Sequence, residues 1–484
     1  MDESDRRTPT YTEAVIPIAS LIVLVALSFY LFGDAGADGP NQVALVVATV
    51  IAVFFAWRRG FTLTELHEAA TASVNSGLGA IFILFAVGAL IGTWALSGTL
   101  VAMVYYGLHI LSPNYFYMTT AIICALVSAS IGSSWTTVGT IGVGLMGISH
   151  SMELNPAITA GAVISGSYFG DTTSPLSDSV NLAAGTTGVD LYQHIREAAL
   201  VSGLAVAIAV GVFWLFGKPG HFDASDKLAS IEAGFRISPL LFIPLVVVIG
   251  LALLRFPPFS AIFIGAITGG LLAVIVAPER VIAFANAGDL PDGLALLKGV
   301  WLALGGGYTS STGFAPIDQL ASRGGMSSML KTIWLIITAL AFGGVVEKSG
   351  ALDKIIAPII NAAKSAGSLV ASLVAAVLTT GIVTADQYMA IVLPARMFKS
   401  TFARRGFAPV VLSRAVGVAA TPTSALIPWN SCGAYMAATL GVATFSYAPY
   451  AIFNLLSPLL VIALAYIGLR MPRNPTTATD AGGS

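Results

Sequence analysis

The chain has 484 residues, of which 56% are hydrophobic and 10% are charged, and its formal net charge is −1. A soluble domain carries about 25% charged residues, so this composition excludes an ordinary soluble protein and predicts an all-α polytopic membrane protein. The balanced charge and the lack of a basic face argue against nucleic acid as a partner. Continuously apolar runs argue against a β-barrel, whose strands alternate apolar and polar residues.

Eight apolar runs are predicted to cross the lipid bilayer as helices, because about 18 or more such residues in a row span its hydrocarbon layer. They cover residues 15–32, 42–57, 78–96, 198–216, 239–254, 259–276, 329–346 and 450–469. The first run follows Arg6 and Arg7, as the apolar part of a signal peptide would, but it is long for such a segment. We therefore expect it to be a membrane span.

Four further apolar regions are interrupted repeatedly by Gly, Pro, Ser, Thr and Asp. They cover residues 115–148, 156–184, 370–397 and 409–440. Interrupted apolar segments at corresponding positions of two halves indicate the binding site of a transporter. We expect these regions to hold the site.

The two halves of the chain correspond at a nearly constant spacing. The matching pairs are Pro156 with Pro409 and Pro175 with Pro428, each 253 residues apart, and Ile131 with Ile382, 251 residues apart. Near the N-terminus the spacing is shorter, which implies an insertion in the second half. Its expected place is 290–327, an amphipathic, Gly-rich stretch that the pattern does not locate in the fold. The competing interpretation is chance recurrence of Gly, Ser and Pro in apolar sequence.

The order of segments predicts the topology. Each half reads as three crossings, an interrupted hairpin and two crossings, the first of them broken. If the hairpin enters and returns on one side, each half crosses five times, and an odd number inverts the second half relative to the first. We therefore predict an inverted repeat of about 5+5 transmembrane helices with two re-entrant hairpins and two broken helices. The predicted division is a cytoplasmic N-terminal segment (1–14), a first repeat (15–216), an inter-repeat loop (217–236), a second repeat (237–470) and a polar tail (471–484).

Basic residues gather in segments that this topology places on one side of the membrane. Examples are Arg58, Arg59, Arg404, Arg405 and Arg470. The positive-inside rule then places both termini in the cytoplasm of a multi-pass protein of the cell membrane. Arg414, one turn into a helix, is expected to extend to the same face.

Ionisable residues inside a membrane span are expensive and point to function. The richest stretch is 170–181, where Pro175 interrupts the helix and frees backbone carbonyls. Asp171 and Asp178 add anionic oxygen, and hydroxyl groups add neutral oxygen, which together suit a hard cation such as sodium; the competing interpretation is a polar loop near a membrane face. The hydroxyl candidates are Thr172, Thr173 and Ser174 on this stretch and Ser133, Ser134, Thr136 and Thr137 at the first hairpin tip.

The matching stretch of the second half, 420–431, keeps hydroxyl groups but lacks carboxylates. Asp171 falls opposite Ser424, and Asp178 falls opposite Ser431. Asp386 at the second hairpin tip is a third candidate acid, although it also suits the N-cap of the following helix. The second-half candidates are Thr384, Asp386, Thr421, Thr423, Ser424, Asn430 and Ser431.

Enzyme motifs are absent from credible positions. The chain shows no Walker A loop, dinucleotide fingerprint or nucleophile elbow, and the glycines at 305–307 lack the Lys-Ser/Thr that should follow them. We expect no enzyme activity and no cofactor. Cys124 and Cys432 both lie in apolar runs and are expected to be buried free thiols.

The interrupted stretches resemble the NhaC family of sodium/proton antiporters, within the wider ion-transporter superfamily. The resembling segments are GSSWTTVGTIGVGLMG at 132–147, GAVISGSYFGDTTSPLSDSVN at 161–181, 322–329 with 339–350, and 421–431. The resemblance implies sodium/proton exchange and an inverted-repeat fold with two hairpins and two broken helices. It also implies ion ligands at Asp171, Ser174, Asp178 and Asn181, the first three as sodium candidates. Related members exchange organic acids, such as malate for lactate with protons and sodium.

We hypothesise that Asp171 and Asp178 bind sodium or protons competitively, because burial and mutual repulsion disfavour two bare charges until a cation neutralises them. The expected partners are therefore sodium, protons and the lipid bilayer. A small organic acid, held by 421–431 and the hairpin amide ends, is the alternative cargo. A passive channel is a third interpretation, and a homodimer is left open.

Overall fold

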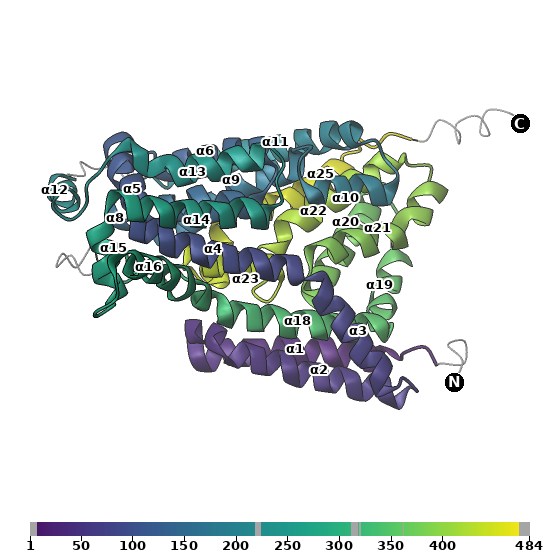
Figure 1. The fold of residues 1–484 in the computed structure, drawn as a ribbon. Helices are drawn as coiled ribbons and strands as arrows, with labels where there is room; N and C mark the ends of the chain where they lie inside the picture. The colour runs from purple at the N-terminus through teal and green to yellow at the C-terminus, as the bar shows by residue number, and fades with distance from the viewer. Residues whose placement is uncertain (1–6, 218–223, 311–317, 319–320, 362, 474–484) are drawn as a thin grey trace, which may run out of the picture.

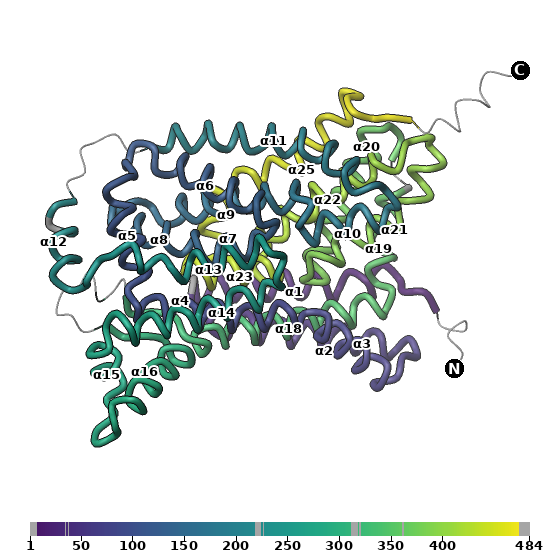
Figure 2. The backbone as a smooth tube through the Cα atoms, turned by 45° about the horizontal axis from the view of Figure 1, so that its top comes forward, coloured from purple at the N-terminus to yellow at the C-terminus, as the bar shows by residue number. Residues whose placement is uncertain are grey.

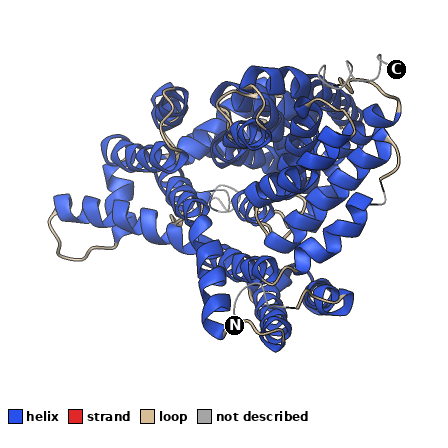
Figure 3. Cartoon of the chain, turned by 90° about the vertical axis from the view of Figure 1, so that its right-hand side faces the viewer, coloured by secondary structure: helices blue, strands red, loops and turns tan. Residues whose placement is uncertain are grey.

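The computed structural model describes residues 7–217, 224–310, 318, 321–361 and 363–473. Within these residues the named elements are all helical. Seven helices are long and apolar enough to cross a membrane, or nine if each of two bent pairs forms one span. Figure 3, which views the molecule from the side where both termini lie, shows this helical composition. The chain is thus the polytopic helical membrane protein that its composition predicts.

Helices α1 and α2 lie together at one side of the molecule, whereas α4 runs through the interior of the bundle (Figure 1). The bounds of the first elements are α1 (Tyr11–Phe32), η2 (Gly33–Asp38), α2 (Pro40–Arg58), α3 (Leu63–Ser76) and α4 (Leu78–Ser97). The side chain of Thr10 caps α1 and pairs with Glu13, so the helix start is fixed by a capping box. Small buried alanines of α2, Ala44 and Ala48 among them, allow close packing of neighbouring helices.

The rest of the first half contains short and broken helices. Their bounds are α5 (Thr99–Ile110), α6 (Phe116–Ile131), α7 (Ser134–Thr137), the π-helical segment η3 (Val138–Gly142), α8 (Val143–Ser151), α9 (Pro156–Thr173), α10 (Asp178–Thr187) and α11 (Leu191–Leu215). A hydrogen bond from the Asn155 amide to the Tyr117 hydroxyl, 3.0 Å, joins the end of α8 to the start of α6. Residues 116–151 therefore leave one end of the molecule and return to it.

The sequence predicted a loop at 217–236, between the two halves. The described part of this connection is partly helical. It contains helix α12 (Ser225–Gly234), which lies at one end of the molecule (Figure 1). Ile231 and Phe235 are each only 3% exposed, so two apolar side chains hold this short helix against the bundle. Residues 218–223 lie outside the described part.

The second half contains long, short and broken helices. Its elements are η4 (Pro239–Phe242), α13 (Ile243–Leu253), α14 (Pro258–Val276), α15 (Pro278–Ala285), α16 (Asp292–Gly306), η5 (Met326–Met329), α18 (Leu330–Lys348), α19 (Ala351–Asn361), α20 (Ala366–Thr384), α21 (Gln387–Arg404), α22 (Pro409–Ser424), α23 (Ser431–Leu440), α24 (Thr444–Tyr447), η6 (Ala448–Tyr450) and α25 (Ile452–Tyr466). The Arg405 guanidinium donates to the carbonyls of Ala363 and Ser365. This contact joins the two open ends of the α20–α21 hairpin, which lie at the end opposite to α5 and α8 (Figure 1).

Helix boundaries recur at one spacing. Helices α9, α10 and α11 begin at Pro156, Asp178 and Leu191, and α22, α23 and α24 begin at Pro409, Ser431 and Thr444, in each case 253 residues later. The helices that lead to the hairpin tips end at the same spacing of 253 residues, since α6 ends at Ile131 and α20 ends at Thr384. The sequence match of Ile131 with Ile382 was therefore displaced by two residues. The true markers are the residues after each helix, Gly132 and Ala385, which both have positive φ, 73° and 56°.

The inserted segment contains α16, with α15 immediately before it. These two helices pack against each other and project from one end of the bundle (Figure 2). The chain then returns to α4, where the Gly325 amide donates to the Gly88 carbonyl, 2.7 Å. A Cβ at Gly92 would lie 2.2 Å from the Ala303 carbonyl oxygen, so glycine permits this close backbone approach. Most of 311–320 lies outside the described residues.

Arg414 does not extend to the membrane face, contrary to the expectation from sequence. Its side chain is 1% exposed and lies 3.1 Å from the Glu197 carboxylate of α11. Arg470, after α25, pairs with the same carboxylate at 2.9 Å. The neighbouring helix thus supplies a partner that the sequence did not reveal, and burial of the guanidinium becomes tolerable. The expectation of buried free thiols at Cys124 and Cys432 is confirmed.

Candidate ion-binding site

Two helix breaks and two hairpin tips organise the site. The first break is 174–177, between α9 and α10; the second break is 425–430, between α22 and α23; the first tip is 132–133, and the second tip is 385–386. A Cβ on Gly132 would lie 2.5 Å from the Cβ of Leu176, so the first tip packs tightly on the first break. The Ser431 amide donates to the Ala385 carbonyl, 2.9 Å, and ties the second tip to the end of the second break.

Asp171 lies at the centre of the first pair and is only 8% exposed. Its Oδ2 accepts a hydrogen bond from Ser134 Oγ, 2.5 Å, which comes from the first tip. Its Oδ1 accepts from Ser177 Oγ at 2.7 Å and from Ser179 Oγ at 3.3 Å, beyond the break. We call Asp171 with these three serines the hydroxyl cradle. Ser177 and Ser179 were not among the predicted ligands, although both stand in the stretch that the sequence singled out.

Asp178 has different surroundings. It follows the N-cap Ser177 in the first turn of α10, and its side chain is exposed. Tyr388 of α21, which is 45% exposed, lies near it. Of the two carboxylates predicted to share a desolvated site, the structure therefore buries Asp171 and leaves Asp178 at an open face.

The predicted threonines of α9 turn away from the cradle. Thr172 Oγ1 lies 2.9 Å from the Phe169 carbonyl and 3.1 Å from Ser202 Oγ on α11. Thr173 Oγ1 donates to the same Phe169 carbonyl at 2.7 Å. Their hydroxyl groups satisfy the helix and its neighbour and do not contact Asp171.

Ser174 and Asn181 shape the first break. Ser174 is 3% exposed, and its Oγ accepts from the Leu176 amide at 3.4 Å. Asn181 Nδ2 donates to the carbonyls of Pro175, 3.0 Å, and Ser177, 2.8 Å. These bonds satisfy carbonyl groups that the interrupted helix leaves without partners, so Asn181 holds the break in shape.

The first tip is held by its own helix and by the second half. Ser133 caps α7 by accepting from the Thr136 amide, 3.2 Å, and Thr137 Oγ1 donates to the Ser133 carbonyl, 2.9 Å. Trp135 stacks on Tyr435 of α23 with ring centroids 4.1 Å apart, and Tyr435 donates to the Trp135 carbonyl. Trp135 therefore packs against the second half of the chain.

The second pair is built around Gln387, which the sequence did not predict. Its Oε1 lies 3.1 Å from Ser424 Oγ and 3.0 Å from Cys432 Sγ. Gln387 stands 253 residues after Ser134, and Ser424 stands 253 residues after Asp171, so the two contacts join equivalent positions. We call Gln387, Ser424 and Cys432 the amide cradle. A spacing of 253 residues applied at the tips, instead of the 251 residues between Ile131 and Ile382, would have paired Gln387 with Ser134 and identified it as a candidate.

Asp386 lies beside the amide cradle at the second tip. Its carboxylate accepts from the Met389 amide, 2.8 Å, which confirms the N-cap role predicted for it. It is 8% exposed. Thr384 Oγ1 donates to the Thr380 carbonyl within α20, 2.9 Å, and does not reach the cradle.

The remaining second-half candidates maintain the second break. Thr423 Oγ1 donates to a carbonyl of its own helix, 2.7 Å, and the Thr421 carbonyl accepts from Ser424 Oγ, 2.7 Å. Asn430 caps α23, and its Nδ2 donates to the Gly381 carbonyl of α20, 3.2 Å. These contacts position the second break and provide its backbone bonds.

The two pairs differ in exposure. On α10, Asp178 and Asn181 are exposed. Their equivalents on α23, Ser431 and Ala434, are only 6% and 3% exposed. The face between α10 and α21 is therefore open, whereas the equivalent face between α23 and α7 is closed by the stacked Trp135 ring.

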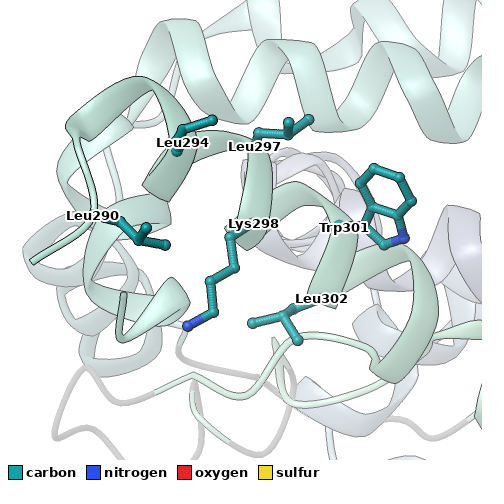
Figure 4. Close-up of a pocket in the computed structure, with 6 residues that line it drawn as sticks. All are labelled: Leu290, Leu294, Leu297, Lys298, Trp301 and Leu302. Carbon is teal, nitrogen blue, oxygen red and sulfur yellow. The ribbon is translucent and has the colours of Figure 1, made fainter. Parts of the chain in front are cut away.

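A separate groove follows the outer face of α16 (Figure 4). Its lining residues are Leu290, Leu294, Leu297, Lys298, Trp301 and Leu302. Trp301 is 71% exposed, and Lys298 Nζ donates to the Asn286 carbonyl. An exposed apolar face suits contact with lipid, so the insertion that the sequence could not place presents a face of this kind and carries no part of either cradle.

Comparison with known proteins gives consistent results. Residues 166–469 match the family model described as the Na+/H+ antiporter family. The Na(+)/H(+) antiporter NhaC of Alkalihalophilus pseudofirmus is 36% identical, over 91% of this chain and 93% of the relative. The Malate-2H(+)/Na(+)-lactate antiporter of Bacillus subtilis is 34% identical over 96% of both chains. The arginine/ornithine antiporter ArcD of Halobacterium salinarum is 33% identical, over 97% and 94%.

Proposed function

The chain belongs to the NhaC family of Na+/H+ antiporters, and on this premise we propose that it exchanges sodium for protons by alternating access, with Asp171 as the group for which the two ions compete. The hydroxyl cradle carries the proposal. It places one buried carboxylate among three serine hydroxyls, drawn from a hairpin tip and from both sides of a helix break. Among the described residues, no lysine, arginine or histidine is hydrogen-bonded to or ion-paired with Asp171, so a mobile cation is left to neutralise it.

Competition follows from the chemistry of this cradle. A carboxylate in a low-dielectric interior needs a counter-charge, and either a proton or a sodium ion supplies one. Ser134, Ser177 and Ser179 can turn from donating to Asp171 to offering oxygen lone pairs to sodium, because a hydroxyl is both donor and acceptor. If only the neutralised forms move the site between the two sides, sodium and protons exchange, and acid pH raises the sodium concentration needed for turnover.

Alternating access is supported by the repeated helix order and by the unequal exposure of the two pairs. The hairpins open at opposite ends of the molecule, as an inverted repeat requires. In the proposed cycle the open α10–α21 face admits ions from the end that carries both termini. The stacked Trp135 and Tyr435 rings close the other face. The distribution of basic residues favours the cytoplasm of a cell-membrane protein for the terminal end.

A second candidate cargo is a small carboxylate that moves with sodium. The amide cradle favours it, because none of its three side chains is charged and it lies at the N-terminus of α23, whose N-cap, Asn430, is neutral and which attracts anions. Malate, lactate, arginine and ornithine, which appear in the names of two relatives, all carry a carboxylate. An organic cargo would therefore use the second half of the site and sodium the first.

The proposal is tested in sealed proteoliposomes that hold a pH gradient. Sodium, potassium, malate, lactate and arginine are added separately, and the internal pH is followed. We expect sodium alone to dissipate the gradient and potassium to leave it unchanged. A gradient that sodium does not affect would contradict the proposal. Unitary currents in a planar bilayer would instead support a channel.

A further inference from the structure

Tyr168 is a fully buried residue whose hydroxyl group has no partner. It is 0% exposed, and its Oη makes no hydrogen bond within the described part of the chain. Tyr168 stands one turn before Asp171 on α9, and Ser424 and Cys432 of the amide cradle lie near its hydroxyl group. A buried hydroxyl group without a hydrogen-bond partner destabilises the fold, and phenylalanine would fill the same space without that cost. Packing alone therefore does not explain why this residue is tyrosine and not phenylalanine.

The amide group of Gln387 presents a second donor. Both of its hydrogen bonds to described residues end on Oε1, from Ser424 and Cys432. A thiol is a donor and a poor acceptor, so the Cys432 contact fixes the amide oxygen on that side. The NH2 group is then turned away from the second break. The Gln387 amide thus has N–H donors to offer, and no basic side chain of the described residues is bonded to the amide cradle.

We propose that the Tyr168 hydroxyl and the Gln387 NH2 group donate hydrogen bonds to an oxygen acceptor that enters the site together with sodium. Donor hydrogens repel a bare cation, so the ligand of this subsite is an oxygen: a water of the ion's hydration shell, or the carboxylate of a small organic acid. The inference rests on the proposed function and supplies the second half of its binding site. Tyr168 bridges the two cradles, since it stands on the helix of Asp171 and reaches Ser424.

The test compares Tyr168→Phe with a matched control, Tyr117→Phe. Tyr117 is also buried, at 3% exposure, but its hydroxyl accepts from the Asn155 amide at one end of the molecule. Thermal unfolding and sodium-driven proton movement are measured for both variants. For Tyr168→Phe we expect equal or greater stability and a half-saturating sodium or cargo concentration raised about 3- to 10-fold, as for one lost hydrogen bond. For Tyr117→Phe we expect lower stability and unchanged half-saturation.

Two arms of the assay distinguish the source of the oxygen. In the first arm sodium is the only added solute, and in the second, uptake of labelled malate or lactate is measured with sodium present. If the acceptor is water, the defect of Tyr168→Phe appears with sodium alone. If the acceptor is a cargo carboxylate, sodium-only exchange keeps its wild-type half-saturation and the defect appears in uptake.

A second variant, Gln387→Met, keeps the side-chain volume and removes both amide groups. If both residues hold one ligand, the double variant should be no worse than the poorer single variant, because their effects are coupled. Wild-type kinetics for Tyr168→Phe in both arms would overturn the inference, as would a loss of transport that only follows a loss of stability. A wild-type chain that moves no protons with sodium would contradict the proposed function itself.

Discussion

The two cradles occupy equivalent positions and carry opposite chemistry. In the first half the acceptor stands on the broken helix, as Asp171, and the donor Ser134 stands at the hairpin tip. In the second half the donor Ser424 stands on the broken helix and the acceptor Gln387 stands at the tip. The hydroxyl cradle therefore holds a negative charge that requires a cation, whereas the three side chains of the amide cradle are neutral and the neighbouring carboxylate, Asp386, caps α21. Positions 253 residues apart in the chain thus carry different side-chain chemistry.

The largest expected effect comes from removing the charge on which the comparison depends. Asp171→Asn keeps the shape of the hydroxyl cradle but leaves no group for sodium and protons to share. We expect sodium-driven proton movement in vesicles to fall by at least about 100-fold, close to background. Asp190→Asn is the matched control, because Asp190 caps α11 and asparagine caps a helix equally well. Normal exchange by Asp171→Asn would contradict the claim that the charge of the hydroxyl cradle is needed for transport.

The difference in exposure predicts different reactivity on the two faces. Asn181→Cys, on the open face, should react with a membrane-impermeant thiol reagent added from the side of the termini. Ala434→Cys, its equivalent on α23, should react about tenfold or more slowly, because a minor state is populated at about 0.1–10%. The unmodified chain supplies the background, since Cys124 and Cys432 are buried. Equal rates would show that the asymmetry is not a property of the protein in a membrane.

The serines of the hydroxyl cradle should matter where other buried hydroxyls do not. Ser179→Ala removes one oxygen from the surroundings of Asp171. We expect the half-saturating sodium concentration in the vesicle assay to rise about 3- to 10-fold. Ser202→Ala is the same change at another buried site, where the hydroxyl contacts Thr172. Ser202→Ala should leave the half-saturating sodium concentration unchanged. Equal increases in both variants would contradict a role for Ser179 in binding the ion.

The smallest effect is expected at the open face. Asp178→Asn should raise the half-saturating sodium concentration about 2- to 5-fold and leave maximal exchange in place, since an exposed charge contributes about 0.2–1 kcal/mol. Asp292→Asn is the control, because Asp292 is also exposed in the first turn of its helix, α16. Loss of all exchange in Asp178→Asn would show that Asp178 is essential for transport and contradict its peripheral role.

The membrane fold was largely predictable, since its signals are local. Long apolar runs marked the spans, and Pro175 and Pro428 marked the two breaks. The error at the second tip arose because Ile131 was matched to another apolar residue, Ile382, whereas the turns themselves are marked by Gly132 and Ala385. Backbone conformation at a single position leaves little trace in an apolar sequence. Arg414 was misplaced for a related reason, because its partner Glu197 is distant in the chain.

The candidate site was predictable at its buried acid and at two hydroxyl groups of the interrupted segments, Ser134 and Ser424. Asp171 stood out as an acid in an apolar run, and the structure places it in a buried cradle. Gln387 and Tyr168 did not, because a neutral amide and an aromatic ring are ordinary in a helix interior. Thr172 and Thr173 were candidates because they carry hydroxyl groups. The structure shows that both hydroxyl groups bond to groups other than Asp171. Contacts between residues distant in sequence decide these cases.

The central claim is that sodium and a proton compete for Asp171. Calorimetric titration of the purified protein with sodium, repeated in buffers of different ionisation enthalpy, measures the protons released per ion bound. We expect release of about one proton per sodium ion, weaker sodium binding as the pH falls, and loss of both binding and release in Asp171→Asn. Sodium binding without proton release, or release that persists in Asp171→Asn, would contradict it.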